Sequence, residues 1–224
     1  MNDYLAVLIS FACVFAILGV AEGLRRAFRF PVEFTRKFVH IGVGMWSWGT
    51  VVLFQNKWFA IIPPAAFIII NYISYRRGLI KTLETGDRSN LGTVYFPIAF
   101  TALILLFFDT GKVVFVAALM PMTWGDAFAA IVGRMKGAHK YTVFGSTRSL
   151  EGSLVMLFLS LIALWITLAV FFPAEPARLF WIALPVSVLV TVVEAISPFG
   201  LDNLLVPAAG ALGIFGILSF LLQA

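Results

Sequence analysis

Long apolar runs fill most of this 224-residue chain and leave room only for short connections. Hydrophobic residues make up 61% of the sequence and charged residues only 12%, a balance that soluble domains do not reach. A transmembrane helix needs about 20 consecutive apolar residues, and the runs here are about 17–22 residues long. The sequence therefore predicts an all-α fold, a polytopic bundle of transmembrane helices.

Eight runs qualify as spans, and a seven-span alternative fuses one of them with a neighbour or makes it re-enter the same face. The runs cover approximately 3–24, 38–54, 57–75, 92–108, 112–133, 152–172, 179–197 and 203–222. Proline is expected to bend two of them, at Pro63-Pro64 and at Pro121. No linker or repeat divides the chain, so residues 1–224 are predicted to form a single domain.

Basic residues are concentrated in alternate connections. The first, third and fifth connections hold all lysines and arginines except Lys57, Lys112 and Arg178. By the positive-inside rule these connections are cytoplasmic, which places both termini on the non-cytoplasmic side. The net charge of +5 indicates contact with anionic headgroups of membrane lipids, and no nucleic-acid partner is expected.

Carboxylates inside the apolar runs gather toward the predicted cytoplasmic side. Asp126 lies eight residues before Arg134, which is about 12 Å of helix below the boundary. An aspartate at the centre of a span costs about 2.5–3.5 kcal/mol on insertion scales, so it indicates a functional site by default. A carboxylate there suits Mg²⁺ that bridges phosphates. The alternative is a polar contact between helices, with Arg36 or Lys37 as the partner.

Glu194 and Asp202 flank the turn Ser197-Pro198-Phe199-Gly200, whose proline and glycine end one helix and can fold the two carboxylates toward each other. For Asp202 or Asn203, simple capping of the last span is an alternative. At the other end of the chain, His40 opens the second span one turn after Lys37. His40 can meet phosphate or accept a proton, or it can serve only as an interfacial residue.

A basic connection follows the run that contains Asp126. In this connection Ser149 can cap the sixth span, whose first amides attract phosphate. Arg148 offers a planar fork for phosphate oxygens, and Ser146 and Thr147 offer hydroxyl donors. The alternative is an ordinary cytoplasmic loop whose cations serve topology alone. A Walker A loop is excluded because G-x-x-x-x-G-K-[ST] does not occur.

At these residues the chain resembles the polyprenol kinase family. The family comprises dolichol, phytol and farnesol kinases and CTP-dependent diacylglycerol kinases, and it is distantly related to the phosphatidate cytidylyltransferases. The matching pieces are Arg36-Lys37-Phe38-Val39-His40, Gly92-Thr93-Val94-Tyr95-Phe96-Pro97, Gly125-Asp126-Ala127 through Gly133, Arg148-Ser149-Leu150-Glu151-Gly152-Ser153, and Glu194 with Asp202-Asn203-Leu204-Leu205-Val206-Pro207. Each piece is weak alone, but five in this order, over nearly the whole chain, are fairly specific.

The resemblance implies transfer of the terminal phosphoryl group of a nucleoside triphosphate, commonly CTP, to the hydroxyl of a lipid alcohol, with Mg²⁺ or Mn²⁺. The short chain favours the phytol-kinase-like or prokaryotic branch, and hence phytol, geranylgeraniol or a polyprenol as the alcohol. The expected location is a prokaryotic cell membrane, with the site facing the cytoplasm. One departure is Arg148, where the family pattern usually has lysine. This difference bears on nucleotide affinity and choice, because the two side chains are not interchangeable at a tight phosphate site.

Each candidate residue then receives an expected role. Asp126, Glu194 and Asp202 are expected to hold the metal. Glu151 or His40 is expected to take the alcohol proton, and Asp126 is counted with them as catalytic. The residues expected to bind the nucleotide are Arg36, Lys37, Lys140, Ser146, Thr147, Arg148, Ser149, Gly152 and Asn203.

Two other functions compete with a kinase. A phosphatidate cytidylyltransferase would use the same CTP site but would make CDP-diacylglycerol and release pyrophosphate. A small ion-coupled transporter would use Asp126 and Glu194 as relays, but it should be built from two repeated halves with matched broken helices, which this chain lacks.

Overall fold

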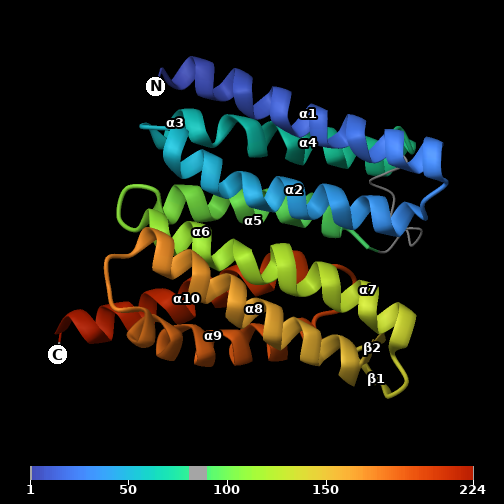
Figure 1. Cartoon of the computed structure of the whole chain (residues 1–224). Coiled ribbons are helices and arrows are strands. Elements are labelled where there is room, and N and C mark those ends of the chain that lie inside the picture. The colour runs from blue at the N-terminus through green and yellow to red at the C-terminus, as the bar shows by residue number, and fades with distance from the viewer. Residues whose placement is uncertain (1, 81–89, 224) are drawn as a thin grey trace.

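The computed structural model describes residues 2–80 and 90–223, and its long helices lie side by side in one bundle (Figure 1). The helices are α1 Asp3–Phe28, α2 Val32–Leu53, α3 Lys57–Ala60, α4 Ile62–Arg77, α5 Gly92–Phe107, α6 Lys112–Met120, the π-helix η2 Pro121–Asp126, α7 Ala127–Lys136, α8 Leu150–Phe171, α9 Pro176–Ile196 and α10 Asp202–Gln223. Strands β1 Lys140–Val143 and β2 Ser146–Ser149 form an antiparallel hairpin before α8. The predicted all-α polytopic bundle is confirmed.

Six helical segments of the described chain are long and apolar enough to cross a membrane. They are Asp3–Phe28, Lys57–Arg77, Lys112–Lys136, Leu150–Phe171, Pro176–Ile196 and Asp202–Phe220. The other two predicted runs are also helical, but α5 has only 16 residues and α2 carries Arg36, Lys37 and His40 in its first half. Eight spans therefore stay a prediction. Two cations of the third connection, Lys81 and Arg88, lie outside the described residues.

Proline interrupts helices near both predicted places. The segment Lys57–Arg77 breaks between Ala60 and Ile62, and Pro63 and Pro64 stand in the first turn of α4, where no amide donor is needed. Pro121 begins η2, a wider π-helical turn between α6 and α7. Such turns are rare and occur frequently at functional sites. Here the π-helical turn ends at Asp126.

The continuous rod of α6, η2 and α7 forms the centre of the bundle. In the most apolar stretch of this rod 78% of the residues are buried, against 22–39% in the corresponding stretches of the other candidate spans. The rod packs against α2, α8 and α10. Gly125 makes one of these contacts possible, because a Cβ atom there would collide with Ser160 and Met156 of α8. The central rod can therefore hold a polar residue away from lipid.

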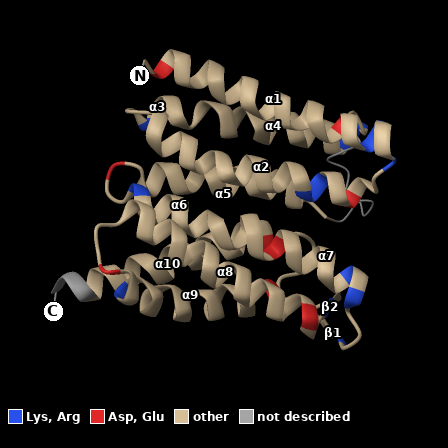
Figure 2. Cartoon of the chain, in the orientation of Figure 1, with Lys and Arg blue, Asp and Glu red and all other residues tan. Residues whose placement is uncertain are grey.

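Both termini lie at the end of the bundle that is remote from the β1–β2 hairpin (Figure 1). Lysine and arginine gather toward the hairpin end, although a few charged residues also mark the opposite end (Figure 2). The structure thus has one strongly basic end, and the candidate site lies near it.

Candidate active site

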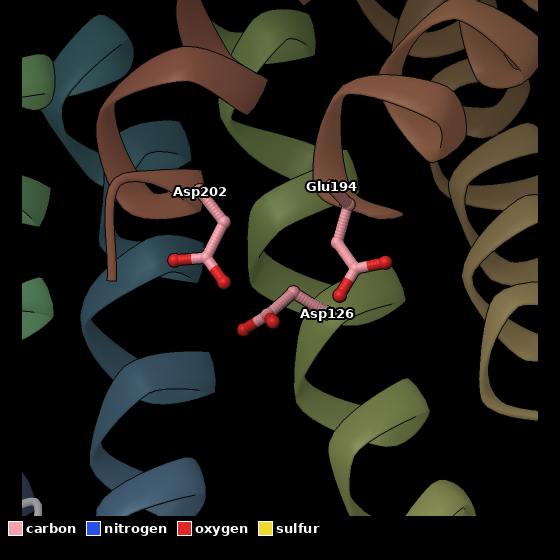
Figure 3. Close-up of side chains that lie close together, drawn as sticks. All are labelled: Asp126, Glu194 and Asp202. Atoms are coloured by element: carbon pink, nitrogen blue, oxygen red, sulfur yellow. The ribbon is translucent and has the colours of Figure 1, made fainter. Parts of the chain in front are cut away.

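Three carboxylates from three helices meet near the hairpin end of the bundle. Asp126 ends η2, Glu194 lies in the last turn of α9, and Asp202 begins α10. Their side chains point toward one another (Figure 3), and one oxygen from each lies within 4.8 Å of the others. All three residues are buried, with 3%, 3% and 5% of their surface exposed. We call these three residues the acidic cluster.

The turn between α9 and α10 brings two members of the acidic cluster together. Phe199 and Gly200 both have positive φ angles, at 54° and 81°, so the chain reverses within a few residues. Gly200 also packs against Asn90 and Gly92, where a Cβ atom would collide with both. A larger residue at position 200 would therefore push Asp202 away from Glu194.

Two cations, the buried Lys37 and the partly buried Arg148, pair with the three carboxylates of the acidic cluster. Lys37 of α2 places Nζ 2.5 Å from Oδ2 of Asp126. Arg148 of β2 bridges the other two carboxylates, with Nε 3.1 Å from Oε1 of Glu194 and Nη2 2.8 Å from Oδ2 of Asp202. The Nε contact is an ion pair without hydrogen-bond alignment. Buried charges persist when they are paired in this way.

The surroundings of Arg148 keep its guanidinium charged. Burial lowers the pKa of Arg148, but the carboxylates of Glu194 and Asp202 outweigh that effect and raise the pKa above its usual value. Nη2 also donates a hydrogen bond to the carbonyl of Ser197 at 3.2 Å. Arg148 therefore stays charged and ties the hairpin to the turn between α9 and α10.

Two further residues of α2 lie beside the acidic cluster. The Nε atom of Arg36 is buried and has no hydrogen-bond partner among the described residues. An unsatisfied buried donor costs about 1–3 kcal/mol, so a ligand that brings an acceptor would be favoured here. The Nε2 atom of His40 lies 2.8 Å from the carbonyl of Met122 and 4.0 Å from Oδ2 of Asp126.

A polar cavity of about 410 Å³ lies on one side of the acidic cluster. Its walls come from α7, the hairpin and the first turn of α8, with one residue each from α2 and α9. They comprise Glu33, Ala129, Ala130, Gly133, Arg134, Lys140, Thr147, Arg148, Ser149, Gly152, Ser153 and Glu194. Ser149 caps α8, because its Oγ atom accepts a hydrogen bond from the amide of Gly152 at 3.1 Å. The cavity therefore combines cations, hydroxyls and the amide end of a helix, which are the groups that bind phosphate.

An apolar cavity of about 100 Å³ lies on the other side. It runs between α1, α2, α4 and α5. Its wall residues are Ser10, Val14, Leu18, Arg36, Lys37, Val39, His40, Val43, Trp46, Thr50, Phe54, Ala60, Pro63, Pro64, Phe67, Asn71, Gly92, Thr93, Phe96, Pro97, Phe100 and Asn203. Charged residues line only one end of it, at Arg36 and Lys37. The acidic cluster thus lies between two unlike cavities.

Most of the residues singled out in the sequence lie around these features, but two do not. Ser146 pairs with Val143 at the tip of the hairpin and is not in the cavity wall. The carboxylate of Glu151 faces Nδ1 of His139 at 2.7 Å and lines neither cavity. Asn203 lines the apolar cavity and donates to its neighbour Asp202 at 2.7 Å.

Sequence reasoning missed Glu33 and His139 and gave no role to Ser153, which it named only as part of a matching piece. Glu33 lines the polar cavity and pairs with Arg134 across it. Its position three residues before Arg36, on one helical face, was the signal that could have found it. Ser153 lines the same cavity and bonds the hydroxyl of Tyr141 at 2.6 Å. His139 has no comparable signal, because its contact with Glu151 depends on the hairpin.

Comparison with known proteins identifies relatives. No family model and no solved structure match the chain. It is 34% identical over 198 residues to the phytol kinase of Synechocystis sp., a match that covers 88% of this chain and 84% of that protein. It is 29% identical over 168 residues to the probable chloroplastic phytol kinase 1 of Oryza sativa subsp. japonica, and 28% identical over 170 residues to the probable chloroplastic phytol kinase of Triticum aestivum.

These plant matches cover 70% of this chain and 53% and 55% of the plant proteins, so the chain spans about half of their length. The cyanobacterial match extends over most of both chains. On the strength of that match, the chain belongs to the family of phytol and polyprenol kinases.

Proposed function

We propose that this protein is a lipid alcohol kinase that transfers the terminal phosphoryl group of CTP to the hydroxyl of an isoprenoid alcohol such as phytol or geranylgeraniol. The observation that carries the proposal is the position of the acidic cluster between a polar and an apolar cavity. Glu194 of the cluster lines the polar cavity, and Lys37, which contacts Asp126, lines the apolar cavity. A nucleotide and a lipid hydroxyl that entered from opposite sides would meet at these carboxylates.

The polar cavity fits a triphosphate. Arg148 supplies a planar fork, Lys140 a second cation and Thr147 a hydroxyl. The capped first turn of α8 adds amide donors with a positive dipole end. Positioning and charge neutralisation are the main tasks of a protein in phosphoryl transfer, so this set of groups matches the chemistry.

The acidic cluster fits a divalent cation, because Mg²⁺ and Mn²⁺ prefer carboxylate oxygens and three converge here. Asp126, Glu194 and Asp202 would hold the ion, which would neutralise charge on the triphosphate oxygens. Lys37 and Arg148 balance the same carboxylates in the absence of ligands. We infer that these two cations turn toward phosphate oxygens when the nucleotide and the metal bind together.

His40 is the better placed of the two candidate bases. A carbonyl oxygen only accepts hydrogen bonds, so the contact with Met122 requires a hydrogen on Nε2 and leaves Nδ1 of neutral His40 as an acceptor. The alcohol proton would pass to Nδ1 while the alcohol oxygen attacks the terminal phosphorus and the nucleoside diphosphate leaves. Glu151 is engaged by His139 instead.

The cytidylyltransferase and transporter alternatives lead to different products. A cytidylyltransferase would attach the CMP moiety to a lipid phosphate and release pyrophosphate. A transporter would consume no nucleotide. The names of the relatives, all phytol kinases or probable phytol kinases, favour the kinase over both.

Purified protein in detergent tests the proposal directly. CTP, UTP and ATP, each labelled in the terminal phosphate, are supplied in turn with phytol, geranylgeraniol, a long polyprenol or diacylglycerol. We expect label in the monophosphate of an isoprenoid alcohol, together with unlabelled CDP. CTP labelled in the innermost phosphate is the control, because only a cytidylyltransferase moves that label into lipid. Absence of label from every lipid would contradict the proposal.

A further inference from the structure

We propose that Glu33 recognises the base of the bound nucleotide: its carboxylate accepts a hydrogen bond from the amino group of cytosine and thereby selects CTP over UTP. The inference rests on the proposed function, to which it adds the residue that selects the donor. Arg134, the ion-pair partner of Glu33, lies beside this contact. We call Glu33 and Arg134 the outer ion pair.

The outer ion pair spans the polar cavity, and both of its side chains line the wall. Glu33 lies in the first turn of α2, and Arg134 lies in the last turn of α7. The side chain of Glu33 is 23% exposed and that of Arg134 is 69% exposed. Glu33 is thus the more enclosed partner, which suits it to contact a ligand inside the cavity.

The outer ion pair is separated from the acidic cluster by a stretch of α7 that lines the cavity. Arg134 follows Asp126 by eight residues, which is about 12 Å along the helix. Ala129, Ala130 and Gly133 lie between these two residues and belong to the cavity wall. Their small side chains leave space beside the helix, so a ligand bound at the acidic cluster can extend along α7 to the outer ion pair.

Charge determines which part of a nucleotide can approach Glu33. The terminal phosphate is expected at the acidic cluster, and Lys140 and Arg148 offer cations to the phosphates. Among the described residues that line the cavity only Glu33 and Glu194 are acidic, and Glu194 belongs to the acidic cluster. A phosphate beside Glu33 would be repelled by its carboxylate. The part that fits there is the uncharged nucleoside, which extends away from the terminal phosphate.

The outer ion pair matches the hydrogen-bonding edge of cytosine. A carboxylate only accepts hydrogen bonds, and a guanidinium only donates them. Cytosine presents an amino group as donor and, next to it, a ring nitrogen as acceptor, so Glu33 and Arg134 can satisfy both. Uracil has an oxygen in place of the amino group, which a carboxylate repels. A ribose hydroxyl could also donate to Glu33, but it would leave the guanidinium without the neighbouring acceptor.

Glu33→Gln tests this assignment. The amide keeps the size of the side chain, but it can accept from the amino group of cytosine or donate to the oxygen of uracil. We expect wild-type protein to prefer CTP over UTP in kcat/KM by about tenfold or more, and this ratio to fall close to one in the variant. Calorimetric Kd values for CDP and UDP, measured with Mg²⁺, should give the same change without turnover.

Two other variants are the controls. Arg134→Gln breaks the same ion pair but keeps the carboxylate of Glu33 and one neighbouring donor. We expect it to bind both nucleotides more weakly and to retain most of the preference for CTP. Glu175→Gln removes an exposed carboxylate at the start of α9 that lines neither cavity, and it should leave the ratio unchanged.

The ratio between nucleotides separates recognition of the base from other roles of Glu33. An ion pair that only joins α2 to α7, or a contact with the ribose, would lower the values for CTP and UTP together. An unchanged ratio in Glu33→Gln, or equal use of CTP and UTP by wild-type protein, would therefore overturn this inference and leave transfer to the alcohol standing. Preferential binding of CDP without transfer from any nucleotide would instead count against the proposed function alone.

Discussion

At the residue scale, the contact between Asp126 and Lys37 governs how the site responds to substitution. Both side chains are buried, and the Nζ and Oδ2 atoms are 2.5 Å apart. Removal of one member of a buried ion pair costs about 3–5 kcal/mol, because the remaining charge is uncompensated. A single variant at either position therefore mixes a structural effect with a chemical one, and a double variant separates them.

The substitution Asp126→Asn should abolish phosphoryl transfer and lower Tm, because it removes a metal ligand and leaves Lys37 unpaired. Adding Lys37→Met should recover most of the lost Tm, since no buried charge then lacks a partner. We expect the double variant to stay inactive. Thermal unfolding and transfer assays on the same preparations provide the test, and full activity in Asp126→Asn would remove this residue from the metal site.

Arg148→Lys tests whether the guanidinium fork is needed. One ammonium group cannot reproduce contacts to Glu194, Asp202 and the carbonyl of Ser197 together. We expect KM for CTP to rise about tenfold and Tm to fall by a few degrees, as the loss of about 1–2 kcal/mol would produce. Arg178→Lys, at an exposed arginine of α9 that lines neither cavity, is the matched control. Unchanged KM in Arg148→Lys would refute the assignment.

The site could be predicted from the sequence in part. Asp126, Glu194 and Asp202 could be grouped because two flank a Pro-Gly turn and all carry charge in apolar runs. The bridge from Arg148 to two of them could not be predicted. It requires the β1–β2 hairpin to fold over the turn between α9 and α10, and such long-range pairing leaves no local pattern. The pairing of Glu151 with His139 was hidden for the same reason.

At the element scale, η2 determines the direction of the Asp126 side chain. A π-helical turn contains more residues than an α-helical turn, so it rotates everything after it relative to a regular helix. Pro121 begins the π-helical turn and supplies no amide hydrogen to the backbone ladder. The preceding helix is buried almost completely, so the rod cannot relieve the distortion by bending into lipid.

Pro121→Ala should restore a regular ladder and turn Asp126 away from Glu194 and Asp202. We expect activity to fall about tenfold or more while Tm stays equal or rises, because the helix itself gains a hydrogen bond. Pro185→Ala, in the middle of α9, is the control for loss of a proline within a helix. A variant at Pro121 with wild-type activity would show that the π-helical turn does not position the carboxylate.

The helices themselves were predictable because run length and hydropathy determine them. Their ends were not. α1 continues to Phe28 and α2 begins at Val32, so charged residues such as Arg25 and Lys37 lie within helices, where Glu22 and Asp126 pair with them. A charged residue that has an ion-pair partner can lie within a helix, although its charge ends the apolar run in the sequence. The β1–β2 hairpin was missed because each strand has only four residues, so the alternation of Lys140–Val143 is too short to be told from an ordinary loop.

At the scale of the whole molecule, both termini lie at the end opposite the hairpin, as an even number of passes requires (Figure 1). The positive-inside rule predicts that the hairpin end faces the cytoplasm, where nucleotides are available.

Cysteine labelling tests this orientation. In a Cys13→Ser background, a membrane-impermeant maleimide added to intact cells should modify a cysteine introduced at Asn2 and should not modify one introduced at Ser146. Permeabilised cells should give label at both positions, which is the control for reactivity. The reverse pattern in intact cells would invert the predicted topology and place the polar cavity on the wrong side for CTP.

In the proposed reaction the acidic cluster joins a metal-bound triphosphate to a lipid hydroxyl. Its most direct test is the transfer of terminal phosphate from CTP to phytol, measured with Mg²⁺ and with EDTA, in wild-type protein and in the double variant Lys37→Met/Asp126→Asn. We expect labelled phytyl monophosphate only from wild-type protein with Mg²⁺. Transfer by wild-type protein in EDTA, or by the folded double variant at the wild-type rate, would contradict it.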